Sequence, residues 1–170
     1  MRIPFLLLVA LGCAAAQNPS AIANQRLFER VTHQLERLPY LTIFDSVSFR
    51  LDGDTVVLEG AVTDPVMRRD AENLVKRVEG VEQVVDQMKV LLPNPFDQQI
   101  RWEVYLALVR QPTLQVYFLQ VLCPIRIVVD DGNVTLEGLV SDQADADLAR
   151  LAAGAVPGML SFKSNLQTVR

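Results

Sequence analysis

Apolar side chains recur along the chain with two different spacings, and the order of these spacings occurs twice. In residues 26–38 and again in residues 98–110, apolar residues return every three to four positions, which predicts an amphipathic helix in each segment. Two stretches follow each helix in which apolar and polar residues alternate, as in half-buried strands. A second helical stretch and a last alternating stretch complete both series. The pattern predicts the order helix–strand–strand–helix–strand twice in one chain.

Residues with special backbone preferences separate the predicted elements. Proline ends a helix, Asp-Gly pairs favour tight turns between strands, aspartate caps the start of a helix, and glycine suits the bend after one. These positions are, in chain order, Pro39, residues 52–54, Asp64 and Gly80 in the first series, and Pro112, residues 131–133, Asp142 and Gly158 in the second. Both series therefore break at equivalent places.

The two series are copies of one unit. Residues 56–60 have the sequence Val-Val-Leu-Glu-Gly, and residues 134–138, which lie 78 positions later, have Val-Thr-Leu-Glu-Gly. The first helices match with an offset of 73 positions, which leaves five additional residues in the second copy between Leu114 and Ile125. A register shared over this length indicates a duplication.

We predict an α+β protein built from two tandem modules. The first module spans residues 26–92 and the second residues 98–170, and the proline-containing segment 93–97 links them. Each module is predicted to form a small sheet with its helices packed on one face, because each helix has a single apolar face to bury.

The first residues have the layout of a secretory signal. Arg2 supplies a positive charge, residues 3–12 are almost wholly apolar, and three alanines precede Gln17. We therefore predict a signal peptide over residues 1–16, followed by an N-terminal lead over residues 17–25. The apolar run is about half the ~20 residues that a membrane-spanning helix needs.

Cys13 supports a second interpretation of this leader. Gly-Cys after an apolar run resembles a lipoprotein cleavage site, although Ala10 stands where a large aliphatic residue is usual. We predict a periplasmic protein, with an outer-membrane lipoprotein anchored through Cys13 as the alternative. The other cysteine, Cys123, is predicted to be a small buried apolar residue, because it lies in an apolar run.

Composition and charge argue against several functions. Lys and Arg total 16 against 20 Asp and Glu, which gives a net charge of −4 and argues against nucleic-acid binding, because phosphate contacts need a basic surface. His33 is the only histidine, no Cys or His pair has metal-ligand spacing, and the acidic segment 130–133 lacks the glutamate that completes a calcium loop. We therefore predict no catalytic residue, metal, cofactor or small-molecule substrate, and no enzymatic activity.

The repeated motif resembles a known family. Residues 56–62 have the sequence Val-Val-Leu-Glu-Gly-Ala-Val and residues 80–85 have Gly-Val-Glu-Gln-Val-Val, while the second copy keeps the first motif at residues 134–140 but has Met159 and Phe162 in place of valines. This order is similar to that of the BON family, named for bacterial osmotically inducible and nodulation proteins. The resemblance implies a non-catalytic stress protein of the periplasm or outer membrane that contacts phospholipid surfaces or envelope proteins. The departures leave open whether both modules bind the same ligand.

The first helices of the two copies differ on their outward faces. The second copy carries apolar or aromatic side chains where the first has polar ones. They are Trp102, Tyr105, Leu106 and Val109, in the places of Glu29, Thr32, His33 and Glu36. Arg101 and Arg110 flank this stripe. Because a water-facing helix would not be expected to carry such a stripe, we predict that these six residues form a membrane-binding or partner-binding site.

Three hypotheses for the stripe remain open. It packs against the first module or a second copy of the chain, it inserts into the headgroup region of a membrane, or it captures an apolar segment of another envelope protein. The predicted function is that of a non-catalytic cell-envelope binding protein, in envelope integrity or stress response. The alternative is a structural, assembly or chaperone-like protein whose stripe forms an inter-module or dimer interface.

Overall fold

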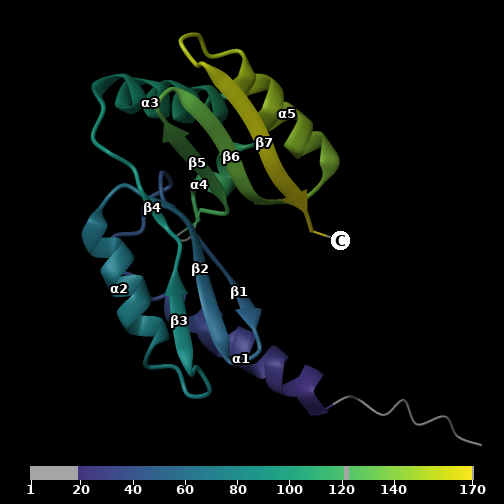
Figure 1. The fold of residues 1–170 in the computed structure, drawn as a ribbon. Coiled ribbons are helices and arrows are strands. Elements are labelled where there is room, and N and C mark those ends of the chain that lie inside the picture. Colours follow the sequence, from purple (N-terminus) through teal and green to yellow (C-terminus); the bar gives the residue numbers. More distant parts are fainter. Residues whose placement is uncertain (1–18, 121–122, 170) are drawn as a thin grey trace, which may run out of the picture.

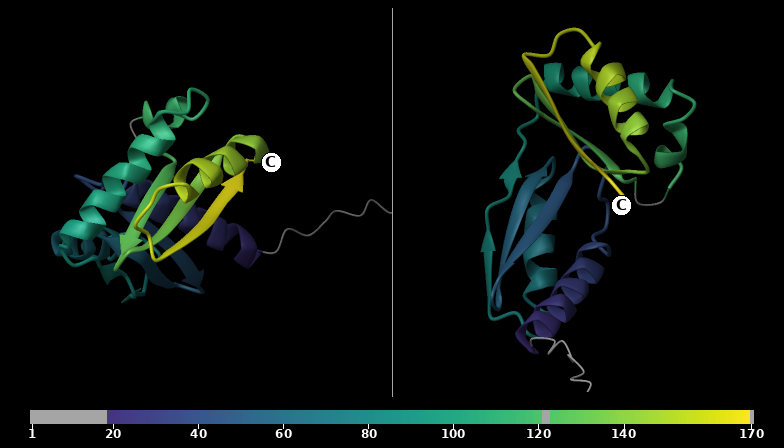
Figure 2. Two further views of the ribbon diagram at one scale, coloured as in Figure 1. Left: turned by 90° about the horizontal axis from the view of Figure 1, so that it is seen from above. Right: turned by 90° about the vertical axis from the view of Figure 1, so that its right-hand side faces the viewer.

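The computed structural model describes residues 19–120 and 123–169. The first module consists of α1 (Pro19–Leu35), β1 (Ser46–Asp52), β2 (Thr55–Val62), α2 (Pro65–Val75), β3 (Gln83–Asp86) and β4 (Lys89–Val90). The second consists of α3 (Pro95–Val109), α4 (Gln115–Phe118), β5 (Ile125–Asp130), β6 (Asn133–Val140), α5 (Gln143–Gly154) and β7 (Ser161–Thr168). Figures 1 and 2 show the modules one beyond the other, each with its own sheet.

The two sheets have the same topology. In the first, β1 pairs antiparallel with β2, and β3 and β4 both pair parallel with β2 on its other side. In the second, β5 pairs antiparallel with β6, and β7 pairs parallel with β6. Each parallel pair is joined through a helix, α2 or α5, because parallel neighbours need a crossover connection. The predicted order of elements and the α+β class are confirmed.

Each module has its own core between one face of the sheet and two helices. In the first, Val56 and Leu58 of β2 pack with Val31 of α1 and with Ala71 and Val75 of α2. The core of the second module draws equivalent residues from α3, α5, β5 and β6, among them Val104, Ala149, Ile127 and Leu136. The prediction that the helices cover one face of each sheet therefore holds (Figure 1). Among the described helices, none has the length and apolar content needed to cross a membrane.

The glycine of the repeated Leu-Glu-Gly motif is required by a close approach of two backbones. Gly60 and Gly138 have φ values of +113° and +125°. A Cβ atom would lie 2.2 Å from the carbonyl oxygen of Ser46 in the first module and 1.8 Å from that of Pro124 in the second. Only glycine fits a positive φ at such a distance, so the motif marks the same backbone contact in both copies.

The predicted ends of several elements differ from the observed ones. Helix α1 begins at Pro19, so most of the predicted lead belongs to it, and α3 begins at Pro95, capped by Asn94, inside the predicted linker. The predicted caps Asp64 and Asp142 are confirmed, because their carboxylates accept N–H groups of α2 and α5. Gly80 and Gly158 have positive φ but lie a few residues beyond the helices, so they turn the chain rather than cap it directly.

Two local features differ from the prediction in kind. The single last strand predicted in the first copy is divided into β3 and β4, with an interruption after Asp86. The additional residues of the second copy contribute the short helix α4, which the apolar pattern does not predict.

Candidate functional site at the module junction

Helix α3 has the two faces that its sequence predicts. Its inward residues Ile100, Val104 and Leu108 are buried in the core of the second module. On the outward face, Trp102 keeps 48% of its surface exposed and Leu106 keeps 44%. Of the other residues predicted for this site, Tyr105 and Val109 are half-buried and Arg110 is exposed.

An aromatic row runs along the outward face of α3 and crosses between the modules. Phe44, Trp102, Tyr105 and Phe118 follow one another with ring centroids 5.6 Å apart in each successive pair and nearly perpendicular planes. Such edge-to-face pairs contribute about 0.5–1.5 kcal/mol each beyond the burial of their area. Phe44 comes from the segment before β1 in the first module, and Phe118 from α4. The stripe is therefore partly covered by the chain itself.

Arg101 does not belong to this surface, and its prediction as a flanking residue is wrong. The side chain is 4% exposed, and its Nη2 donates to the carbonyl oxygen of Val129 at 2.7 Å. Burial lowers the pKa of the guanidinium, while the nearby charge of Asp97 raises it. The reason for the error is helical geometry, because Arg101 stands three and seven residues before Val104 and Leu108 and so shares their inward face.

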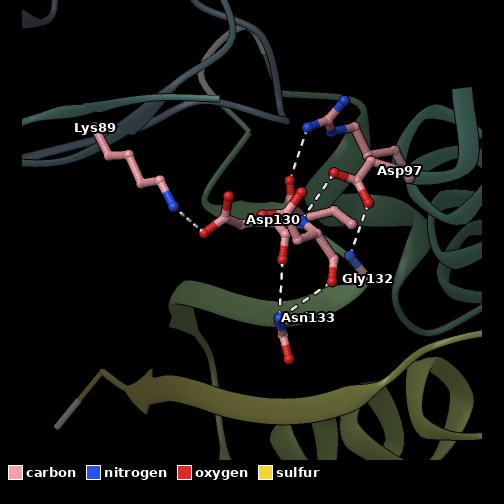
Figure 3. A network of polar contacts seen from close by, with 8 residues as sticks. Lys89, Asp97, Asp130, Gly132 and Asn133 are labelled. Carbon is pink, nitrogen blue, oxygen red and sulfur yellow. Dashed lines mark hydrogen bonds and ion pairs between the residues drawn. The ribbon is translucent and has the colours of Figure 1, made fainter. Parts of the chain in front are cut away.

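Asp97 anchors the turn between β5 and β6 (Figure 3). Its buried carboxylate accepts the N–H groups of Asp131 at 3.0 Å and of Gly132 at 2.8 Å. Asp131 and Gly132 both have positive φ, as expected of a two-residue hairpin turn. The segment that resembled a calcium loop is thus a hairpin turn held by α3, and no cluster of metal-ligating side chains occurs in the part of the chain that the structure describes.

Polar contacts tie the first module to this region. Lys89 of β4 forms an ion pair with Asp130 of β5 (Figure 3), and the hydrogen bond to Asp130 raises the pKa of Lys89. Ser46 Oγ donates to the carboxylate of Glu137 on β6. The backbone N–H of Ile127 donates to the carbonyl oxygen of Ile43 at 2.8 Å, so residue 43 lies along the free edge of β5.

Asp45 holds the segment that makes these contacts. Its side chain is wholly buried, and Oδ2 accepts the backbone N–H and the hydroxyl of Thr42 at 2.9 and 2.5 Å. Its other oxygen accepts the N–H and the hydroxyl of Thr63 at 2.7 and 2.8 Å. This carboxylate fixes residues 42–44 in the conformation that presents Phe44 to Trp102.

Sequence reasoning missed part of the exposed apolar surface. Helix α4 carries Val116, and Leu119 follows it with 85% of its surface exposed. Because Phe118 packs on Tyr105, α4 lies against the outward face of α3 and extends its apolar surface. The five-residue insertion was a signal for a difference at this place, but its length alone does not indicate which side chains face outward.

These features define a protein of two tandem α+β modules that meet at a partly exposed aromatic surface. The profile of the BON domain matches residues 27–91 and 97–169, so the chain belongs to the BON domain family. It is 25% identical to the osmotically-inducible protein Y of Escherichia coli (strain K12), in an alignment that covers 94% of this chain and 90% of that protein.

Two solved structures are more distant. One is the C-terminal domain of CdsD, the structural protein of the type III secretion system of Chlamydia trachomatis, with 11% identity over 85% of this chain and 98% of that chain and a TM-score of 0.33. A second structure of CdsD has 13% identity over 85% of this chain and 92% of that chain, with a TM-score of 0.30. TM-scores this low do not establish a common arrangement of the modules.

Proposed function

We propose that this protein is a non-catalytic binding protein of the bacterial cell envelope that contacts phospholipid membranes through the outward face of α3. The observation that carries the proposal is the exposure of Trp102 and Leu106 beside the exposed apolar residues of the α4 region. Membership of the BON domain family and the similarity to an osmotically inducible protein support a role in envelope integrity or stress response. Export to the periplasm belongs to the same proposal, and the predicted signal peptide and Cys13 lie outside the described residues.

Insertion of apolar side chains is expected to dominate over charge in this contact. Full burial of one large apolar side chain contributes roughly 1.5–3 kcal/mol, and half of Trp102 and of Leu106 remains to be buried. Arg110 is the one predicted arginine at the surface, and a basic residue near an anionic surface adds only about 1 kcal/mol. With a net charge of −4, the protein should bind vesicles with little dependence on salt.

A second candidate function follows from the contacts of the stripe inside the molecule. Phe44 and Phe118 already cover part of Trp102 and Tyr105, which favours a role of the stripe in joining the modules. An envelope protein, or a second copy of the chain, would then take the place of the membrane on the remaining exposed part. This is the structural or assembly function predicted as the alternative.

The fluorescence of Trp102, the only tryptophan, separates these possibilities. In the purified protein the emission should be intermediate, because half of the indole is exposed, and it should shift to the blue when vesicles of phosphatidylethanolamine and phosphatidylglycerol are added. The variant Leu106→Glu should abolish the shift, whereas Leu151→Glu, an exposed leucine on α5, should retain it. A blue shift that follows protein concentration and ignores vesicles would instead support self-association.

A further inference from the structure

An apolar groove of about 350 Å³ lies between α1 and β1 of the first module. Phe28 and Leu35 contribute to its wall from α1, and Val47 and Phe49 from β1. Phe28 keeps 48% of its surface exposed, and its ring packs on that of Phe49 with centroids 4.8 Å apart. Hollows of this size with mainly apolar walls are typical of ligand sites.

The strand beside this groove has a free backbone edge. β1 is the outermost strand of its sheet, and in the described residues its only strand partner is β2. Alternate residues of an edge strand direct their N–H and C=O groups away from the sheet. Such an edge can accept another extended segment as an additional strand.

In the second module, the equivalent strand edge is covered by another part of the chain. Residues 42–45 form a turn beside strand β5, closed by the hydrogen bond from Asp45 N–H to the carbonyl oxygen of Thr42, and Ile127 N–H donates to the carbonyl oxygen of Ile43. Ile43 and Phe44 pack against the core of that module, and Phe44 lies on Trp102 of α3. A turn of the first module, with Ile43 and Phe44 at its tip, thus occupies the place between helix and edge strand.

In the first module, no segment among the described residues lies beside the position of β1 that is equivalent to Ile127. Phe49 is the counterpart of Ile127, since it lies 78 positions earlier and faces Leu58 as Ile127 faces Leu136. The backbone N–H of Phe49 is therefore expected to point away from the sheet, as that of Ile127 does. Unlike the edge of β5, this edge borders the open groove.

Arg126 supplies a positive charge at one end of the groove. It lines the groove from β5, and its Nη1 donates to the carbonyl oxygen of Thr42 at 2.9 Å. Burial lowers the pKa of its guanidinium, while the nearby charge of Asp45 raises it. None of the salt bridges among the described residues includes Arg126. A peptide that runs antiparallel to β1 would end near the first residue of this strand, and its carboxylate would complement Arg126.

We propose that the groove between α1 and β1 binds an extended peptide segment that pairs antiparallel with β1, places apolar side chains against Phe28 and Phe49, and ends with its C-terminal carboxylate at Arg126. A peptide fits better than a lipid because it also pairs with the free strand edge. This site is independent of the α3 surface.

The test is fluorescence anisotropy of the full chain with a labelled peptide of sequence Tyr-Leu-Thr-Ile-Phe. This probe repeats residues 40–44, of which Ile43 and Phe44 pack against the core of the second module, and it has a free C-terminal carboxylate. We expect saturable binding, at least about tenfold weaker in Phe28→Glu and in Arg126→Gln, because each removes an apolar or charge-assisted contact of that size. The affinity of the amidated peptide for the protein without substitutions should be lower by a similar factor.

The matched controls are Val66→Glu, which alters an equally exposed apolar residue on α2, and Arg110→Gln, and both should bind the probe normally. Absence of saturable binding, or full binding by Phe28→Glu, would overturn the proposal. Equal affinity for the amidated peptide would refute the role of Arg126. If dodecanoate below its micelle concentration binds with the same dependence on Phe28 while the peptide does not, the groove is a lipid site and the proposal is wrong.

Discussion

The two modules place the same kind of helix beside the same kind of edge strand, but the space between helix and strand differs. In the second module residues 42–44 lie along β5, and Phe44 and Phe118 pack on the aromatic face of α3. In the first module the space between α1 and β1 remains an open groove, and the outward face of α1 is polar. After a duplication, the site of one module can be filled by the other module, while the corresponding site of that other module stays open for a partner.

The largest expected effect concerns Asp45 and its counterpart Cys123, which lies 78 positions later. Asp45→Ala removes four hydrogen bonds of a wholly buried carboxylate, and we expect it to lower the free energy of unfolding by about 3–4 kcal/mol. Cys123→Ala should cost only about 1 kcal/mol, because it removes a small buried side chain. Urea unfolding followed by circular dichroism measures both. Equal losses would show that Asp45 has no special role at the junction.

A slightly smaller effect is expected at Asp97. Asp97→Ala leaves the N–H groups of Asp131 and Gly132 without their acceptor and removes the countercharge of buried Arg101, so stability should fall by about 2–3 kcal/mol. The counterpart in α1, 73 positions earlier, is the exposed Asn24, and Asn24→Ala should change stability by less than about 0.5 kcal/mol. If both variants unfold at the same urea concentration, the turn does not depend on α3.

Removal of Phe44 should alter both stability and binding. Phe44→Ala deletes a half-buried ring from the junction, and we expect a loss of about 1–2 kcal/mol. It should also expose more of Trp102, so that the emission shifts to the red. Phe28→Ala, in the open groove, should leave the emission unchanged. An unchanged spectrum in Phe44→Ala would mean that the junction is not closed by this ring in solution.

The smallest effect is a dependence on alkaline pH. Burial raises the pKa of the Cys123 thiol above its ordinary value of 9.0. The folded-state pKa of this thiol is above that of the unfolded chain. The stability that the neutral thiol contributes is therefore complete below about pH 8 and is lost as the pH rises beyond about 9. The difference in stability between the parent and Cys123→Ala should therefore be constant up to pH 8 and then decline. A constant difference up to pH 11 would contradict burial of the thiol.

Most of the fold can be predicted because it depends on short-range patterns. The apolar spacing, the turn residues and the repeated Leu-Glu-Gly motif identify the elements and their duplication, and the inward face of α3 follows from its helical periodicity. Arg101 was assigned to the wrong face although it has the helical spacing of Val104 and Leu108, and its partners are a backbone carbonyl in β5 and the charge of Asp97.

The junction and the groove could not be predicted from these patterns. The carbonyl oxygen of Ile43 accepts a hydrogen bond from Ile127, a strand residue more than eighty positions later, and no local periodicity indicates such a contact. Phe28 has the helical spacing of the core residues Val31 and Leu35, and only the path of β1 shows that it lines a groove instead of the core. Arg126 reaches that groove from the other module, so its place depends on how the modules meet.

Hydrogen exchange of two equivalent backbone amides tests the difference between the modules most directly. In the free protein the amide of Ile127 should exchange slowly, because it donates to Ile43, while the amide of Phe49 should exchange fast. Saturation with the peptide Tyr-Leu-Thr-Ile-Phe should slow exchange at Phe49 and leave Ile127 unchanged. Equal protection of the two amides without peptide, or no response of Phe49 to it, would contradict the account.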